Sequence, residues 1–354
     1  MNPKCTVIFP CRGLEPGLET NARAVLAQDY PAYEVLLVTT ADDASLPLLQ
    51  RLAGEYSGRA RVVVAEWSAT CAQKLANQVA ATRAAAPETA VYVFLDSDGL
   101  VPPGFVRRMI APLADPGVGM VTGWRWYLAE RGRFWSYVRS AWNAGAMPFL
   151  VDNRHNIAFG GAMAVWREVF ERAGVMDKWC RGVSDGLMLA RAVKDLGLRV
   201  KFAPRCIAVS REGGSFSEVL EWTNRQTTIS HVCMPEFWRF TAMAHSVSIL
   251  VLVGTVVAGG LAAGGWGAVC AMAVYLGLLE ANAVFMVYSV SKALESGVAR
   301  ELRDGVGWYV LAAPVASWLY GVNIARSILS RRITWRGISY ELINPVETVL
   351  LENN

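Results

Sequence analysis

The sequence predicts an α/β fold with a mainly parallel sheet, followed by C-terminal transmembrane helices. Three observations predict it. About the first 200 residues alternate short apolar runs with longer amphipathic ones. The stretch Phe240–Ser291 holds a single Asp, Glu, Lys or Arg residue, Glu280. The 354 residues are 53% hydrophobic and only 18% charged, which is unusual for a wholly soluble chain.

The N-terminal part alternates predicted strands and helices. The apolar runs predict strands at Thr6–Phe9, Glu34–Thr39, Arg61–Glu66, Val91–Leu95 and Val118–Thr122. Amphipathic patterns between them predict helices at Leu18–Gln28, Leu46–Glu55, Ala72–Ala85 and Pro103–Ala114. This alternation is typical of a parallel sheet covered by helices on both faces. Ligands bind such sheets beyond the carboxyl ends of the strands, so polar residues there are candidates.

The next part of the chain continues this pattern less regularly. A helix is predicted at Asp185–Asp195, a strand at Leu198–Phe202 and an amphipathic helix at Phe216–His231. We therefore expect one cytoplasmic globular domain over residues 1–232, because the N-terminus lacks the long apolar core of a signal peptide.

The C-terminal third predicts membrane helices. Ala242–Ala263 and Trp266–Val290 have 22 and 25 residues. At 1.5 Å per residue each can cross a hydrocarbon layer of about 30 Å. The short link Gly264–Gly265 between them predicts a helical hairpin. A third apolar run, Val306–Ala325 within a segment 306–329, contains Pro314 and could span as a kinked helix or dip in and return. We favour a re-entrant or split segment.

Basic residues predict the orientation. They flank the third run on both sides, at Lys292, Arg300 and Arg303 and again at Arg326, Arg331, Arg332 and Arg336. Both flanks are therefore predicted to be cytoplasmic, as is the globular domain. We expect a membrane domain over 233–330 and an interfacial tail over 331–354, in the inner or plasma membrane if the source is bacterial.

Charge and cysteine usage exclude several classes of protein. A net charge of +4 without a basic stripe argues against a dedicated nucleic-acid binder, and it suits an anionic membrane surface. The seven cysteines form no CxxC pair. They indicate reduced thiols rather than a disulfide framework or a zinc site.

The strongest local signal follows a predicted strand. Val91–Leu95 runs directly into Asp96, Ser97 and Asp98, so a buried strand delivers two carboxylates to the ligand-binding edge. Such oxygen ligands suit Mg²⁺ or Mn²⁺, with substrate phosphates completing the shell. The alternative is an ordinary solvated turn, in which Asp and Ser are common.

Several segments in order resemble family 2 glycosyltransferases, especially the ceramide glucosyltransferase-like branch. They are Ile8-Phe9-Pro10-Cys11-Arg12-Gly13-Leu14-Glu15, Gln73-Lys74-Leu75-Ala76-Asn77, FLDSDGLVPPGFV, FGGAMAV, SDGLMLARAVKDLG and the three late apolar runs. The resemblance covers essentially the whole chain. It implies a Rossmann-like nucleotide-sugar fold of the GT-A type, an inverting mechanism, Mg²⁺ or Mn²⁺ and a UDP-sugar donor.

The resemblance also implies donor-binding residues. Pro10 and Arg12 would lie near the nucleotide, in the loop after the first strand. Asp42 or Asp43 would contact the base, and the intervening Thr39-Thr40-Ala41 leaves the choice open. Lys74 would lie near the nucleotide or diphosphate, the alternative being a surface lysine on a helix.

A second set of residues that the resemblance implies concerns the metal and the proton transfer. Asp96, with Ser97, would approach the ribose or sugar, and Asp98 would be the more direct metal ligand. Asp185 would be the general base that takes the proton from the acceptor hydroxyl. Asp185 begins a helix, so an N-cap is the alternative. Here Ser184 stands where family members usually carry an acidic residue.

Acceptor-side candidates come from two segments. Gly160 and Gly161 would let the backbone approach the sugar or acceptor. The alternative is an ordinary glycine turn that opens a strand. Arg225 and Gln226 would contact the diphosphate or acceptor, or belong to the polar face of an amphipathic helix. The family's Gln/Arg-x-x-Arg-Trp motif is incomplete here, because the tryptophan precedes the arginine. His155 is an auxiliary acceptor-site candidate.

The sequence thus predicts transfer of a hexose, glucose from UDP-glucose first, to a membrane-lipid hydroxyl. Acceptors could be ceramide-like lipids, diacylglycerol or hopanoids. One alternative is a processive polysaccharide synthase, which usually has more transmembrane helices. The other is a non-catalytic nucleotide-sugar-binding membrane protein, which would be expected to lose Asp98 or Asp185.

Overall fold

The computed structural model describes residues 2–150 and 156–351, so His155 lies outside the described residues. The chain divides into two compact units. The first comprises Met1–Trp126, Ala146–Arg211 and Thr334–Asn354. The second comprises Tyr127–Gly145 and Glu212–Ile333. The domain boundaries predicted at residues 232 and 330 stay predictions.

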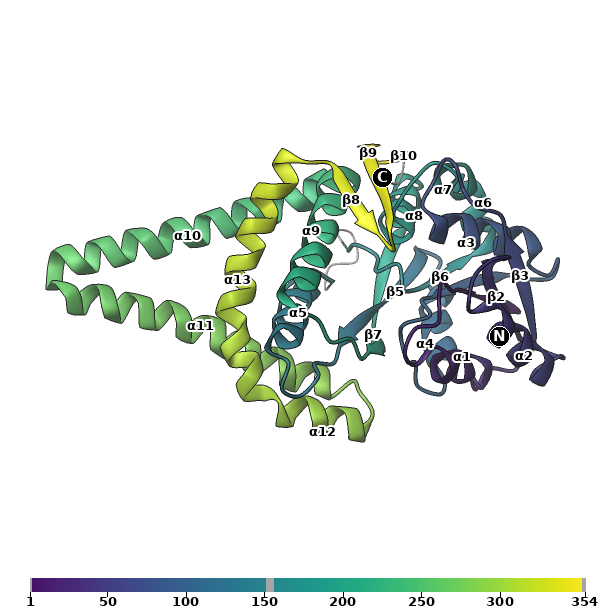
Figure 1. Ribbon diagram of the computed structural model, residues 1–354, viewed down its shortest axis with the longest axis horizontal. Helices are drawn as coiled ribbons and strands as arrows, with labels where there is room; N and C mark the ends of the chain where they lie inside the picture. Colours follow the sequence, from purple (N-terminus) through teal and green to yellow (C-terminus); the bar gives the residue numbers. More distant parts are fainter. Residues whose placement is uncertain (1, 151–155, 352–354) are drawn as a thin grey trace. The chain divides into compact units, whose positions relative to one another are not determined.

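A seven-stranded mixed sheet forms the first unit's centre (Figure 1). Its strands are β1 Cys5–Pro10, β2 Tyr33–Thr40, β3 Ala60–Ala65, β4 Val91–Leu95, β5 Val118–Tyr127, β6 Ala162–Trp166 and β7 Arg199–Ser210. They lie in the order β3-β2-β1-β4-β6-β5-β7. β1 pairs in parallel with β2 and β4, and β2 with β3. β6, which the sequence offered only as the alternative for the Gly160–Gly161 turn, runs antiparallel to β4 and β5. The mainly parallel α/β fold is confirmed.

Helices of the first unit fill the connections between these strands. They are α1 Leu18–Leu26, α2 Leu46–Glu55, α3 Gln73–Ala84, α4 Phe105–Ile110, α6 Arg167–Arg172, α7 Val175–Trp179 and α8 Asp185–Asp195, with short 3₁₀ turns at Ala111–Ala114 and Met147–Leu150. Every residue of β1 and β4 is buried. This explains their continuous apolar runs, because a strand covered on both faces needs no polar alternation.

The second unit is helical. It contains α5 Phe134–Ala144, α9 Phe216–Cys233, α10 Pro235–Ala263, α11 Gly265–Ser291, α12 Ser296–Asp304 and α13 Val306–Leu329. α10 and α11 have 29 and 27 residues, and both are long and apolar enough to cross a membrane. They pack side by side as a hairpin (Figure 1). Their apolar side chains are almost all unburied within the structure, so the hairpin presents a large exposed apolar surface.

The third apolar run forms a continuous helix, α13, that passes through Pro314 without a break. The bend lies before it, where α12 and α13 meet at 66°. One face of α13 packs against α5, α9 and α11. Its buried residues are Tyr309, Ala312, Ala316, Leu319, Asn323 and Ser327. A split inside the run is therefore wrong. Whether α12 and α13 together cross a membrane or re-enter it stays a prediction.

The C-terminal tail forms a small sheet of β8 Arg332–Trp335, β9 Ile338–Asn344 and β10 Glu347–Leu351. Most of it belongs to the first unit. The Thr348 amide donates to the carbonyl of Arg181 at 2.8 Å, and the Tyr340 side chain is buried. An interfacial position of this tail stays a prediction.

Candidate active site

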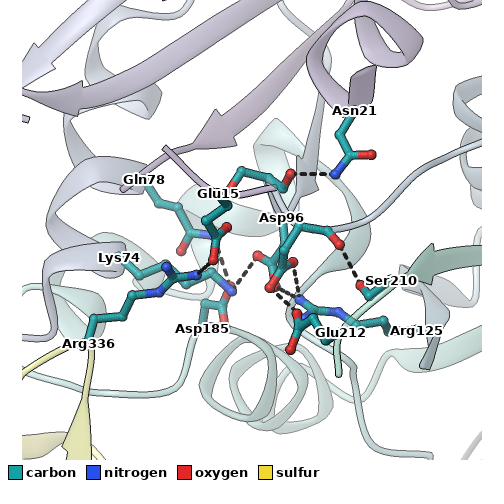
Figure 2. A network of polar contacts seen from close by, with 12 residues as sticks. Glu15, Asn21, Lys74, Gln78, Asp96, Arg125, Asp185, Ser210, Glu212 and Arg336 are labelled. Atoms are coloured by element: carbon teal, nitrogen blue, oxygen red, sulfur yellow. Dashed lines mark hydrogen bonds and ion pairs between the residues drawn. The ribbon is translucent and has the colours of Figure 1, made fainter. Parts of the chain in front are cut away.

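The turn after β4 is a braced, partly buried structure. The Asn21 side-chain amide donates to the Ser97 carbonyl at 2.9 Å. The Ser210 hydroxyl donates to the Asp98 carbonyl at 2.6 Å (Figure 2). The Ser97 side chain is buried. These bonds hold Asp96 and Asp98 at the carboxyl edge of the sheet, so the alternative of a solvated turn is wrong.

Both carboxylates converge on one nitrogen of Arg125, which comes from β5. Arg125 Nη2 lies 2.5 Å from Asp96 Oδ2 and 2.7 Å from Asp98 Oδ1. Its Nη1 donates to Asp98 Oδ2 at 2.7 Å. Sequence reasoning missed Arg125. A cation inside the otherwise apolar run Trp124–Tyr127 was the available signal, because a buried arginine requires a partner.

Lys74 joins the turn after β4 to the start of α8. Its Nζ lies 2.6 Å from Asp96 Oδ1 and 2.9 Å from Asp185 Oδ2. Burial opposes the charges in this cluster. Asp185 and Asp96 nevertheless raise the pKa of Lys74 above its usual value, and Lys74 and Arg125 lower the pKa of Asp96. Lys74 is therefore a largely buried charged partner, with its side chain 16% exposed, and its reading as a surface lysine is wrong.

Asp185 is the first residue of α8, and Ser184 holds the N-cap position. The Asp185 carboxylate accepts a hydrogen bond from Gln78 Nε2 at 2.9 Å in addition to its pair with Lys74. Both partners come from α3 (Figure 2). The carboxylate is thus held by a neighbouring helix and not by its own helix end, so the N-cap alternative is wrong. Its role as a base stays a prediction.

The glycine pair before β6 makes room for these carboxylates. A Cβ atom at Gly160 would lie 2.7 Å from Asp185 Cγ, and one at Gly161 would lie 2.6 Å from Asp96 Oδ2. Real Cβ atoms are not found this close to such atoms. The two glycines therefore bring backbone against Asp96 and Asp185, where any larger residue would push the carboxylates away.

The loop after β1 carries a second group of candidates. Pro10 ends β1, and the Arg12 guanidinium lies 5.1 Å from the ring centre of Trp67. Trp67 is half exposed, and its Nε1 donates to Asp42 Oδ1 at 3.0 Å. Trp67 is another residue that sequence reasoning missed. Its exposed ring beside a cation and a carboxylate suits recognition of a flat polar group.

Asp43 has a different position from Asp42. Its carboxylate accepts from the Gly13 amide at 2.9 Å, and from the Ser45 amide and hydroxyl at 2.8 and 2.6 Å. Burial alone would raise the pKa of Asp43, but these bonds outweigh it and lower that pKa. Asp43 therefore ties the loops after β1 and β2 together, whereas Asp42 is exposed, and which of the two contacts a base stays a prediction.

The tail reaches the same loop. Arg336 pairs with Glu15, and its Nη1 donates to the Arg12 carbonyl at 3.5 Å. Arg336 is the only non-glycine with positive φ in the part of the chain that the structure describes, at 53°. With Gly337 at 77° it makes the tight turn between β8 and β9. Arg336, which lies 321 positions after Glu15 in the chain, thus supports the loop of Pro10 and Arg12.

Arg225 and Gln226 lie on α9, in the second unit. Both are partly buried. The remaining site candidates all lie in the first unit. A role of Arg225 and Gln226 toward the diphosphate or acceptor stays a prediction.

The carboxylates after β4 fit a divalent cation. Oxygens of Asp96 and Asp98 already converge on a single positively charged atom. No group of three or more His, Cys, Asp or Glu residues arranged to hold a metal occurs among the described residues. Two carboxylates with phosphate oxygens completing the shell are typical of Mg²⁺ sites and unlike a structural zinc site.

Comparison with known families identifies the family. The sequence profile described as glycosyl transferase family 21 matches residues 1–345. The chain belongs to glycosyl transferase family 21. The predicted glycosyltransferase class is therefore confirmed, whereas the family shown is family 21 and not the family 2 that the resemblance named.

Solved structures give more distant likenesses. A mannosyltransferase from Pyrobaculum calidifontis, in complex with GDP-Man and Mn²⁺, is 21% identical over 90% of this chain and 88% of that one, with a TM-score of 0.48. Glucosyl-3-phosphoglycerate synthase from Mycobacterium tuberculosis is 16% identical over 60% and 72%, with a TM-score of 0.38. At these identities the substrates of those proteins are not carried over to this member of family 21.

Proposed function

We propose that this family 21 protein has a GT-A catalytic domain that transfers a hexose from a UDP-sugar, first of all UDP-glucose, to the hydroxyl of a membrane lipid. The observation that carries the proposal is the single cluster of Asp96, Asp98 and Asp185. It combines two metal-type carboxylates with one carboxylate suited to proton abstraction. Ceramide-like lipids, diacylglycerol and hopanoids are the acceptor classes.

The donor would bind along the carboxyl edge of the sheet. Asp42 and Trp67 would contact the nucleoside, and Arg12 and Lys74 would face the diphosphate. Their contacts support this arrangement, because Arg12 stacks on Trp67 and Trp67 binds Asp42. Lys74 reaches both ends of the carboxylate cluster. These residues would bind and orient the donor before the transfer.

The transfer is an inverting displacement. The lipid hydroxyl oxygen attacks the anomeric carbon, and an Asp185 carboxylate oxygen takes the hydroxyl proton. The bond between the anomeric carbon and the diphosphate oxygen breaks, and UDP leaves with that electron pair. Gln78 and Lys74 would hold Asp185 in place for the proton transfer. Gly160 would leave room for the Asp185 carboxylate itself, because a Cβ there would lie 2.7 Å from Asp185 Cγ.

Asp96 and Asp98 would hold the Mg²⁺ or Mn²⁺ ion. When bound, the ion would neutralise charge that develops on the departing diphosphate. The acidic pair lies on a rigid turn braced by Asn21 and Ser210. Such rigidity favours a defined position for the ion–diphosphate group.

The second unit supports a lipid acceptor. At 1.5 Å per residue, α10 and α11 are about 44 and 40 Å long, more than the roughly 30 Å needed to cross a bilayer. A membrane-anchored enzyme would meet its acceptor at the surface of the bilayer, with the catalytic domain on the cytoplasmic side. The lipid would then keep its apolar chains in the membrane during the reaction.

The test is UDP release by the detergent-purified full-length protein with Mg²⁺ or Mn²⁺. UDP-glucose, UDP-galactose and UDP-GlcNAc are crossed with ceramide, diacylglycerol and hopanoid acceptors. We expect acceptor-dependent release that Asp185→Asn and Asp98→Ala both abolish, while Asp185→Asn still binds UDP. Sugar polymer without added lipid would instead support a synthase. UDP-sugar binding without release under every condition would support a non-catalytic binding protein.

A further inference from the structure

A guanidinium fills the position between the two carboxylates after β4. Nη2 of Arg125 lies 2.5 Å from Asp96 Oδ2 and 2.7 Å from Asp98 Oδ1. A Mg²⁺ ion held by the same carboxylates needs their oxygens at about 2.0–2.1 Å. The guanidinium and the ion would therefore require the same oxygens, and both are cations. They cannot occupy this position together.

Arg125 is built into the first unit and is not a surface residue that happens to lie nearby. Its side chain is 7% exposed, and its guanidinium lies 5.3 Å from the ring centre of Phe159. Lys74 pairs with the other oxygen of Asp96. The partly buried carboxylates are thus paired with side-chain cations, which offsets the cost of removing their charges from water.

We propose that Arg125 is a resident cation that the divalent ion displaces when the donor binds. The free protein then binds Mg²⁺ or Mn²⁺ weakly, and the ion enters together with the nucleotide diphosphate. This inference rests on the proposed function. A guanidinium released from two carboxylates matches phosphate oxygens well, so the diphosphate compensates the arginine for the partners it loses.

The experiment measures Mn²⁺ binding and not turnover. Free Mn²⁺ is followed by electron paramagnetic resonance as the ion is titrated into the detergent-purified full-length protein, with and without UDP. Arg125→Gln is compared with the wild type. Arg107→Gln is the matched control, because Arg107 is an exposed arginine paired with Asp29. Asp98→Ala identifies binding at this site.

We expect the wild type to bind Mn²⁺ tightly only with UDP. Without UDP, Arg125→Gln should bind it at least about tenfold more tightly than the wild type, a difference of about 1.4 kcal/mol. Arg107→Gln should behave as the wild type. The Mn²⁺ affinity of Arg125→Lys without UDP should lie between those of the wild type and Arg125→Gln, because lysine keeps the charge on a single shorter group. This variant keeps the test informative if Arg125→Gln does not fold.

Two results would overturn this inference and leave the proposed function unaffected. One is tight Mn²⁺ binding by the wild type without UDP. The other is Mn²⁺ binding by Arg125→Gln and Arg125→Lys that is equal to or weaker than that of the wild type. Arg125 would then support the metal site. A failure of every variant to bind Mn²⁺ even with UDP would overturn both this inference and the metal role in the proposed function. UDP release that needs no metal would independently show that the metal role in the proposed function is wrong.

Discussion

Gly160 lies so close to Asp185 that no side chain fits between them. A Cβ atom at Gly160 would lie 2.7 Å from Asp185 Cγ. We predict that Gly160→Ala lowers kcat by about 10²-fold or more, because it displaces the proposed base by about an ångström. Gly54→Ala in α2 is the control, since a Cβ there meets nothing within 4 Å. Steady-state UDP release measures both, and an unchanged kcat for Gly160→Ala would show that Asp185 is not positioned by this contact.

Lys74 is the counterion of both Asp96 and Asp185. We predict that Lys74→Met lowers the thermal unfolding midpoint by roughly 5 °C or more, because it removes the lysine that both largely buried carboxylates share. Lys4→Met, which removes a pair exposed at 41% and 68%, should change the midpoint little. Added Mn²⁺ with UDP should restore part of the loss in Lys74→Met. Equal midpoints for the two variants would mean that the Lys74 pairs do not stabilise the fold.

Asp43 should contribute pH-dependent stability. Its hydrogen bonds lower the pKa of Asp43 below 3.8, so its contribution is present above that pH and is lost as the pH falls through the folded-state value. We predict that Asp43→Asn is less stable than the wild type at pH 7 and that the difference shrinks toward pH 3. Thermal unfolding across this pH range measures it. A difference that stays constant with pH would exclude this ionisation as the cause.

Asp42→Asn provides the contrast. The Thr40 hydroxyl lowers the pKa of Asp42 too, but this carboxylate is exposed, so solvent screens its contribution to stability. We expect a smaller change in the unfolding midpoint than for Asp43→Asn, together with a raised KM for the UDP-sugar. Donor titrations at saturating acceptor measure the KM. A raised KM only for Asp43→Asn would reverse the assignment of the two residues.

Gly259 and Gly267 bring α10 and α11 together near the end of their hairpin. A Cβ at Gly259 would lie 2.7 Å from the Gly267 carbonyl oxygen. We predict that Gly259→Leu separates the helices and lowers the unfolding midpoint in detergent, because small residues allow close packing of membrane helices. Gly254→Leu on the same helix meets nothing within 4 Å and should be tolerated. Equal midpoints for both variants would contradict the close crossing.

Much of the first unit was predictable from local sequence. The predicted bounds of Val91–Leu95, Leu46–Glu55 and Asp185–Asp195 are those observed, because their apolar periods are strong and each has a defined end. The bounds and antiparallel direction of β6 were not predicted, and a strand after Gly160–Gly161 was only an alternative. A five-residue run after two glycines has no period long enough to separate a strand from a turn, and its direction depends on its neighbours.

The sequence by itself determined the α/β class, the turn of Asp96 and Asp98 after β4 and the two long apolar helices. Each of these depends on the order and spacing of nearby residues. Only the tertiary structure brought Arg125 between the two carboxylates, Lys74 against Asp185, and Arg336 to the loop of Arg12. These contacts join residues 27 to 324 positions apart, and such partners are selected by the packing of the whole unit rather than by any local pattern.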